Sequence, residues 1–172
     1  MAGDGGEEFV AGCDLEIGGF VPWLMAEADE GWEKEKKNPK RIGELSQAAF
    51  LQKAQSLGFG LAMPWGDSEK CDFIVWARPE GRLMRVQVKA TGRLNGGGYD
   101  VQPVYSSRGA GKKRYTAQEI DVLAAHVQGV DAWYLLPVRV VARVKNLRLF
   151  PGLRSRNPRW EEYREAWEWL RG

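Results

Sequence analysis

Three polar residues lie within two apolar stretches that are separated by a short turn. Asp72 begins the stretch DFIVWA, while Gln87 and Lys89 lie inside RLMRVQVKA, after a turn at 79–81. Polar groups among apolar neighbours cost free energy unless they are paired or used in chemistry. Two interpretations are therefore open: a charge pair inside a structural hairpin, or three parts of one reactive site.

Strand geometry determines whether these side chains can meet. Residues 71–77 and 82–90 are predicted strands, and alternate residues of a strand share a face, so Gln87 and Lys89 point the same way. An antiparallel hairpin folded near Glu80 places Asp72 opposite either Gln87 or Lys89, on the same side of the sheet. Either register gathers a carboxylate, an amide oxygen and an ammonium at one end of the hairpin.

This set of groups suits phosphate chemistry. Mg²⁺ prefers oxygen ligands and usually takes one or two carboxylates, with water and substrate phosphate completing its shell, and Mn²⁺ accepts the same ligands. Asp72 would supply charge, Gln87 a neutral oxygen and Val88 its backbone carbonyl. Lys89 would orient or activate a water and offset charge in the transition state. The set predicts metal-assisted hydrolysis of a phosphodiester bond.

A helix predicted at 41–57, with Gly58 at its C-terminal end, brings a second carboxylate into consideration. Glu44 lies about one turn from Ala48 and two turns from Leu51, so it shares a face with small and apolar residues. It could therefore turn inward and complete the cluster. The alternative is a first-turn glutamate favoured by the helix dipole.

The rest of the chain alternates predicted strands and helices. Further strands are expected at 59–63, 99–105 and 132–138, and a basic, glycine-containing loop at 106–115. A capping box of Thr116 and Glu119 predicts a helix at 117–127, and Asn157–Pro158 predicts a last helix at 158–171, while 139–150 is ambiguous. This order predicts an α/β domain with a central mixed sheet of four to five strands flanked by helices.

Charge is distributed unevenly along the chain. Residues 1–35 hold ten acids and one base, a net charge of −9, whereas the remaining residues carry +11. A basic body suggests an anionic partner such as double-stranded DNA, although an ordinary basic surface has the same composition. The candidate DNA-binding residues are Arg108, Lys112, Lys113, Arg114, Arg139, Arg143, Lys145 and Arg148.

Composition also argues against several classes. No apolar run approaches the length of a membrane span, so no membrane partner is expected. Cys13 and Cys71 fit no metal or disulfide framework and favour a cytoplasmic location. His126 is the only histidine, which excludes multi-histidine metal sites, and we expect it to be a packing or surface residue. Two parts are predicted: a flexible acidic arm and linker at 1–40, and a domain at 41–172.

The reactive set resembles the PD-(D/E)XK nuclease superfamily. Asp72 matches the Asp of its motif, 87–89 matches (D/E)-x-K, and Glu44 matches an acid that many members carry on the first helix. The similarity extends over about 41–170 and is strongest to a group with Q-x-K, related to an intron-encoded homing endonuclease. It implies a restriction-endonuclease-like core, Mg²⁺-dependent DNA cleavage by a metal-activated water, and a homodimer or homotetramer.

Two departures from the family pattern keep other functions open. Cys71 stands where the motif has Pro, and Gln87 supplies less charge than Glu. A weaker metal site or an inactive one would follow from the second departure. The alternatives are therefore a catalytically inactive DNA-binding protein of the same fold and a Holliday-junction resolvase.

Overall fold

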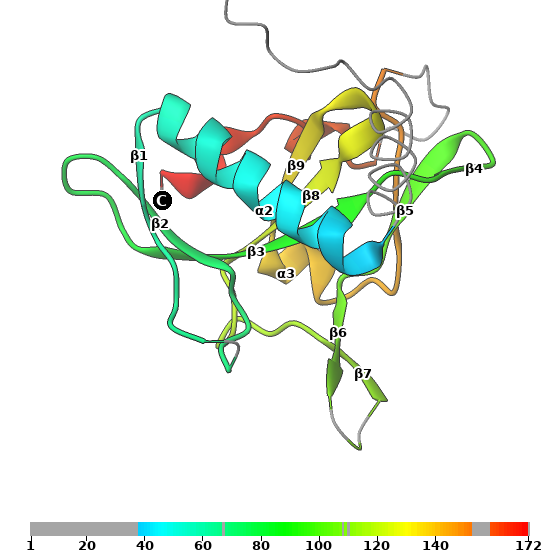
Figure 1. Ribbon diagram of the computed structural model, residues 1–172, viewed down its shortest axis with the longest axis horizontal. Coiled ribbons are helices and arrows are strands. Elements are labelled where there is room, and N and C mark those ends of the chain that lie inside the picture. Colours follow the sequence, from blue (N-terminus) through cyan, green and yellow to red (C-terminus); the bar gives the residue numbers. More distant parts are fainter. Residues whose placement is uncertain (1–37, 67, 108, 110, 153–158, 172) are drawn as a thin grey trace, which may run out of the picture. The chain divides into compact units, whose positions relative to one another are not determined.

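The computed structural model describes residues 38–66, 68–107, 109, 111–152 and 159–171, and a five-stranded sheet forms their centre (Figure 1). Its strands, in spatial order, are β1 (Phe59–Ala62), β2 (Phe73–Ala77), β3 (Met84–Thr91), β8 (Val122–Val127) and β9 (Ala132–Pro137). β3 and β8 are parallel, and the other neighbours are antiparallel. The prediction of a mixed α/β sheet is thus confirmed.

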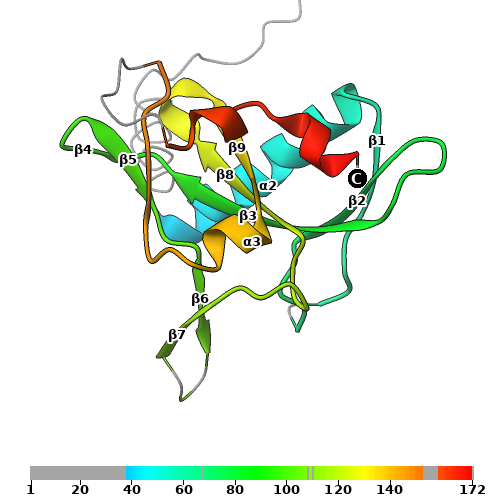
Figure 2. The same cartoon turned by 180° about the vertical axis from the view of Figure 1, so that it is seen from behind.

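Each face of this sheet has its own hydrophobic cluster. On β8, Val122 and Ala124 pack with Phe50 of the helix α2 (Pro39–Ser56), whereas Leu123 and Ala125 belong to the cluster of the opposite face. This division follows from strand alternation, and both faces are buried. The second face is covered by α3 (Val138–Val141) and by a smaller sheet of β10 (Leu147–Leu149), β5 (Gly98–Val101) and β4 (Leu94–Asn95) (Figure 2).

Helix α2 begins two residues earlier than predicted. Asn38 is its N-cap and accepts a hydrogen bond from the Lys40 backbone N–H at 3.0 Å, with Pro39 at the first helical position. These are the residue types favoured at such a start, so part of the segment read as a linker is the beginning of the helix. Ser46, Phe50 and Ala54 form its buried stripe, at a spacing of four residues.

The helix predicted at 117–127 is wrong, because 122–127 forms β8, an internal strand of the sheet. Half of the capping box forms: the Thr116 N–H and hydroxyl both donate to Glu119 Oε2, at 2.8 and 3.0 Å, but the Glu119 N–H donates to the Thr116 backbone carbonyl at 3.0 Å. Only a turn follows it, since residues 122–127 are completely buried and pair with both β3 and β9. A strand buried on both faces is a continuous apolar run, which the sequence cannot distinguish from a buried helix.

The last helix predicted at 158–171 is also wrong. The segment forms two short 3-10 turns, η2 (Glu161–Tyr163) and η3 (Trp167–Leu170), while Asn157 and Pro158 lie outside the described residues. Between the turns, Glu165 forms two hydrogen bonds with the Trp133 backbone, one from its N–H at 2.7 Å and one to its carboxylate at 2.8 Å. Pairing with the edge strand β9 therefore replaces helical hydrogen bonds here.

The chain between 99 and 115 differs from prediction in two ways. The strand expected at 99–105 is divided at Gln102 and Pro103 into β5 and β6 (Val104–Ser107). The predicted loop at 106–115 is largely a β-hairpin, in which β6 pairs with β7 (Gly111–Arg114) and projects from the domain (Figure 1). Pro103 lacks the N–H needed to continue a ladder, which accounts for the break.

His126 is a packing residue, as expected, and connects α2 to the sheet. Its ring nitrogens hydrogen-bond Ser46 Oγ at 2.9 Å and Asp131 Oδ1 at 3.0 Å, and its ring stacks on Trp133 with centroids 4.0 Å apart. Gln128 in the 3-10 turn η1 (Gln128–Val130) also donates to Ser46 Oγ, at 3.0 Å. Ser46 is completely buried, so these contacts are structural and the serine has no access to a substrate.

Acidification should destabilise the protein through His126. Burial lowers the pKa of this imidazole, with Asp131 and Glu165 opposing the shift. The unfolded chain keeps a pKa of about 6.5 and takes up the proton first as the pH falls. Above about pH 6.5 the free energy of unfolding should have its full value, and it should decline as the pH falls through the pKa that His126 has in the folded protein. Urea unfolding between pH 7.5 and 5.5 measures this, and His126→Gln should show a flatter profile.

None of the helices in the described part of the chain is both long and apolar enough to span a membrane. The predicted acidic arm lies, apart from its last residues, outside the described residues, as does Cys13.

Candidate active site

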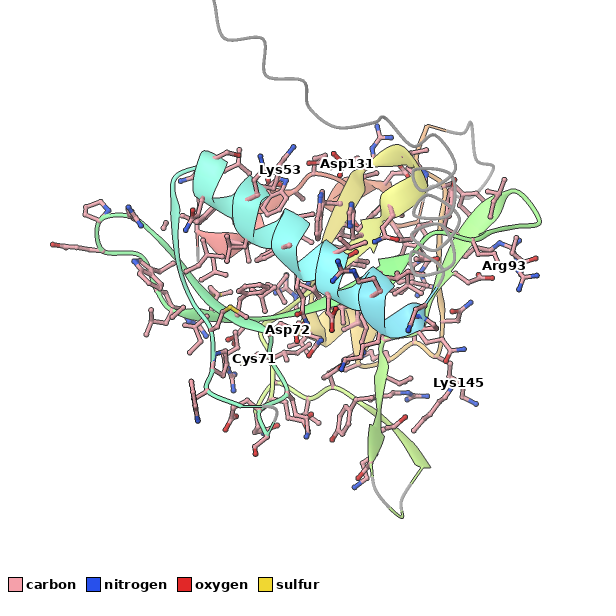
Figure 3. The ribbon with its side chains drawn as sticks, in the orientation of Figure 1. Lys53, Cys71, Asp72, Arg93, Asp131 and Lys145 are labelled. Atoms are coloured by element: carbon pink, nitrogen blue, oxygen red, sulfur yellow. The ribbon has the colours of Figure 1, made fainter. Side chains whose placement is uncertain are left out.

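Asp72 directly precedes β2 and lies where that strand meets β3 (Figure 3). Phe73 pairs with Val86 and Ile74 with Arg85, so the same register places Asp72 opposite Gln87. The Asp72 N–H continues the ladder by donating to the Val86 carbonyl at 2.8 Å. Of the two registers that the sequence allowed, the structure has the one that opposes Asp72 and Gln87.

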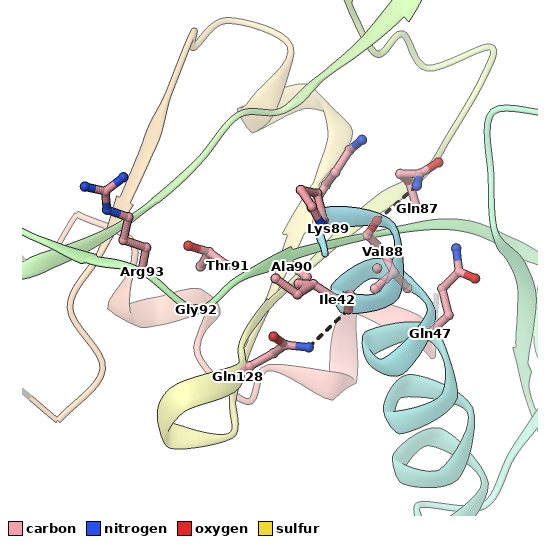
Figure 4. Close-up of a pocket in the computed structure, with 12 residues that line it drawn as sticks. Ile42, Gln47, Gln87, Val88, Lys89, Ala90, Thr91, Gly92, Arg93 and Gln128 are labelled. Atoms are coloured by element: carbon pink, nitrogen blue, oxygen red, sulfur yellow. Dashed lines mark hydrogen bonds between the residues drawn. The ribbon is translucent and has the colours of Figure 1, made fainter. Parts of the chain in front are cut away.

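The Asp72 carboxylate is the centre of a small hydrogen-bond cluster. Its Oδ2 accepts from Gln87 Nε2 at 2.6 Å and from the Val88 N–H at 2.8 Å. Gln87 Nε2 also donates to the Val88 carbonyl at 3.0 Å (Figure 4). The amide nitrogen thus lies between two oxygens, one from Asp72 and one from the Val88 backbone.

Burial raises the pKa of the Asp72 carboxyl, because the charged form is desolvated. The Val88 N–H, the Gln47 side chain, the Lys89 charge and the Gln87 amide oppose this shift by stabilising the carboxylate. A buried carboxylate with several donors is held in place by hydrogen bonds that also define its orientation.

Gln47 of α2 is a member of this cluster that the sequence reasoning missed. Its side chain stabilises the charged form of Asp72, which lowers the pKa of that carboxyl, and it lines the same cavity as Gln87. Glu44, one turn earlier, is instead exposed over 49% of its side chain and pairs with Arg41 at 3.5 Å. Gln47 lies three residues after Glu44 and four before Leu51, so helical spacing could have identified it.

Lys89 is half-buried on the same face of β3 as Gln87. Burial lowers the pKa of its ammonium, and the nearby Asp72 charge opposes that effect. Its Nζ lies 5.5 Å from the centroid of the Tyr115 ring. The Lys89 ammonium and the Asp72 carboxylate are therefore near enough for their charges to interact.

Two cavities adjoin the Asp72 cluster. The larger, of about 800 Å³, extends along β3 from Gln87 to Arg93 and is bounded by Gln47 and the first turn of α2 (Figure 4). The smaller, of about 370 Å³, is lined by Lys89 together with Tyr105 and Lys112 of the hairpin. Lys89 lines both, so a substrate phosphate could approach it from either side.

The predicted DNA-binding residues fall into separate groups. Lys112, Lys113 and Arg114 are exposed on β7, whereas Arg108 lies outside the described residues. Arg143 and Lys145 are exposed beyond α3.

Two other predicted DNA-binding residues have structural contacts. Arg139 packs over the Trp169 ring at 5.0 Å, and Arg148 donates to the carbonyls of Asn95 and Gly96. Both residues are nevertheless exposed, as are the three adjacent cations of β7 on the hairpin.

The donor set is compatible with a divalent cation of the magnesium type. Within the described ranges, no group of three or more His, Cys, Asp or Glu side chains could hold a metal ion. Asp72 and the Val88 carbonyl nevertheless share one hydrogen-bond partner, Gln87 Nε2, so both oxygens face the same point. One carboxylate with neutral oxygens meets the preference of Mg²⁺, provided that water and phosphate fill the remaining positions.

Known proteins resemble this chain over most of its length. The family model described as PD-(D/E)XK endonuclease matches residues 37–170. A solved bacterial homing endonuclease, I-Ssp6803I, has 29% sequence identity and a TM-score of 0.65, covering 76% of this chain and 91% of that one. A search of curated proteins finds no match. Both matches agree with the resemblance drawn from Asp72 and 87–89.

Proposed function

The chain belongs to the PD-(D/E)XK endonuclease family, and on that premise we propose that it hydrolyses DNA phosphodiester bonds in a metal-dependent reaction at the Asp72 cluster. The observation that carries the proposal is the convergence on Asp72 Oδ2 of Gln87 Nε2 at 2.6 Å and the Val88 N–H at 2.8 Å. These contacts gather the residues of the family motif at the edge of two cavities, with Lys89 beside them.

Asp72, the Val88 carbonyl and the Gln87 side chain would hold the cation, which we take to be Mg²⁺ with Mn²⁺ as a substitute. Gln87 must turn its amide to offer Oε1, because its nitrogen faces both oxygens in this structure. When bound, the cation would lower the pKa of a coordinated water and offset charge on the phosphate. Gln47 would keep the Asp72 carboxylate oriented toward the site.

Lys89 has a separate role in the proposed reaction. It lines both cavities, and its ammonium can donate to the attacking water or to a phosphate oxygen as negative charge develops there. Its partial burial strengthens this interaction, because electrostatic effects increase as water is excluded. Glu44 is exposed and paired with Arg41, so we assign it no contact with the reacting atoms.

The substrate proposed is double-stranded DNA. The support is the exposed, positively charged strand β7, with Lys112 lining the cavity that also contains Lys89. Basic side chains beside a reactive site neutralise phosphates and fix the register of the duplex. Cutting both strands requires two sites, so we also propose a homodimer or homotetramer, in the cytoplasm.

Plasmid cleavage tests the proposed activity. Supercoiled DNA should be nicked or linearised in the presence of Mg²⁺ or Mn²⁺, and the reaction should stop in EDTA. Cleavage that continues in EDTA would contradict the metal dependence. Comparison of random linear duplex with four-way junctions in the same assay would distinguish a general endonuclease from a junction resolvase.

The orientation of Gln87 favours a second candidate, a catalytically inactive DNA-binding protein. Its Nε2 hydrogen-bonds the two oxygens that a cation would need, so the amide lies where the cation would bind. Such a protein would bind DNA in a salt-sensitive manner and would show no saturable binding of Mg²⁺ or Mn²⁺ by calorimetry. Saturable binding lost in Asp72→Ala would decide for the nuclease.

Neutralising the hairpin should weaken DNA binding in a salt-dependent manner. The triple variant Lys112→Ala, Lys113→Ala, Arg114→Ala removes three exposed cations. Each lost phosphate contact should reduce the slope of log K against log salt by about one, so we expect a total decrease of about two to three. Fluorescence anisotropy over a salt series measures it.

Lys53→Ala provides the matched control, because Lys53 lies near the C-terminal end of α2 and contacts Glu165 at 3.8 Å. It removes a cation of the same kind away from the hairpin. The control removes one cation and the hairpin variant three, so the decreases in slope are compared per cation. An equal decrease per cation would mean that charge in general, rather than the hairpin, determines affinity.

A further inference from the structure

Tyr115 follows the last residue of β7 directly and lies under Lys89. Its side chain is buried, and the Lys89 ammonium is 5.5 Å from its ring centroid. A cation held over the face of an aromatic ring is attracted by the ring quadrupole, more strongly where water is excluded. One side chain thus connects the basic hairpin to the amine at the candidate active site.

The Tyr115 ring is itself held by a second tyrosine. Tyr105 of β6 packs against it with centroids 5.2 Å apart, and the Tyr105 hydroxyl donates to Glu119 Oε1 at 2.7 Å. Lys70 lies over Tyr105 at 5.3 Å. The two rings are tilted by 44° and in contact, a lysine lies over each of them, and Glu119 fixes the Tyr105 ring.

The turn after Tyr115 is fastened to β3 by Arg85. Its guanidinium donates to the Ala117 carbonyl at 2.7 Å, to the Gln118 carbonyl and to Asp121 Oδ2 at 3.0 Å. The Arg85 N–H donates to the same Asp121 oxygen at 2.8 Å. The guanidinium thus makes its hydrogen bonds to backbone carbonyls and a carboxylate of this turn. This structural role explains why β3 contains an arginine, and DNA binding is not needed to account for it.

We propose that Tyr115 is a positioning residue, which holds the Lys89 ammonium beside Asp72 and couples the hairpin to the reactive site. This proposal rests on the proposed function, because it assigns Lys89 a part in cleavage. The ring acts through Lys89 and touches no reacting atom. Tyr115 directly follows Arg114, the last residue of β7. DNA that contacts β7 would therefore act on the strand next to the tyrosine that supports Lys89.

Two substitutions at Tyr115 test the proposal. Tyr115→Leu removes the ring, and we expect kcat to fall about tenfold with KM little changed. A decrease of this size corresponds to the loss of one cation–π contact that stabilises the transition state. Tyr115→Phe keeps the ring and should restore most of the activity. Tyr99→Leu removes a buried tyrosine from the same hydrophobic cluster and controls for weakened packing. Urea unfolding of each variant establishes that it is folded in the assay.

A second readout is independent of cleavage. The Lys89 ε-methylene protons should show an upfield ring-current shift in the full-length protein and in Tyr115→Phe, but not in Tyr115→Leu. Loss of the shift with cleavage unchanged would reject the positioning role alone, as would a Phe variant as impaired as the Leu variant. Failure of the wild-type protein to cleave DNA would reject the proposed function and this role with it.

Discussion

Asp72→Asn should reduce metal-dependent plasmid cleavage by roughly a thousandfold or more while leaving the fold intact. The substitution removes the one negative charge in the cluster formed by Gln87 and Val88. Asparagine has the same shape, and its carbonyl oxygen can still accept from the Val88 N–H. We therefore expect activity to be lost because the cation loses a charged ligand, and not because the packing changes.

Asp72→Ala should lose activity equally and stability as well. The Val88 N–H, now bonded to Asp72 Oδ2 at 2.8 Å, would be left without that acceptor. A buried donor without a partner costs about 1–3 kcal/mol. The free energy of unfolding should therefore fall by that amount in the Asp72→Ala variant but by much less in the Asp72→Asn variant.

Lys89→Met tests the other reactive group, since methionine keeps an apolar stem against Tyr115 without the ammonium. The cleavage rate of Lys89→Met should fall nearly as far as that of Asp72→Asn, whereas its affinity for Mg²⁺ should be unchanged. The measurements are initial cleavage rates, urea unfolding and calorimetric Mg²⁺ titration. Metal-dependent cleavage that survives both Asp72→Asn and Lys89→Met would overturn the assignment of these residues.

Gln87→Glu should tighten Mg²⁺ binding by about tenfold or more, because affinity at such sites increases with the number of charged ligands. Without metal the same change should destabilise the protein. Gln87 Nε2 donates to Asp72 Oδ2 at 2.6 Å, and a carboxylate cannot make that donation unless it is protonated. Two carboxylates this close repel each other until a cation or a proton lies between them.

The prediction for Gln87→Glu has two measurable parts. The Tm without metal should fall below that of the wild type, and saturating Mg²⁺ should raise it by more than in the wild type, because binding to the folded state stabilises it. Gln52→Glu makes the same charge change at an exposed position of α2 and should do neither. An unchanged Mg²⁺ affinity in Gln87→Glu would show that position 87 is not a ligand.

The local pattern of the sequence determined the hairpin and limited its register to two possibilities. Alternation along β2 and β3 and a turn near Glu80 limited Asp72 to two partners on the same face, and the structure has Gln87. Such predictions succeed because the side-chain period of a strand is two and the turn fixes which residues oppose each other. The apolar run at 132–137 was likewise sufficient to predict β9.

Only the tertiary structure decided whether the buried apolar run at 122–127 is a strand or a helix, and which residue of α2 lies beside Asp72. Residues 122–127 follow the capping contact between Thr116 and Glu119, yet they are a strand, because pairing with β3 and β9 outweighs local propensity. Gln47 rather than Glu44 lies at the site, because the rotation of α2 is fixed by burial of Ser46, Phe50 and Ala54 against the sheet. The position of Tyr115 under Lys89 likewise depends on Tyr105 across the hairpin and on Arg85, a residue distant in the chain that holds the next turn to β3.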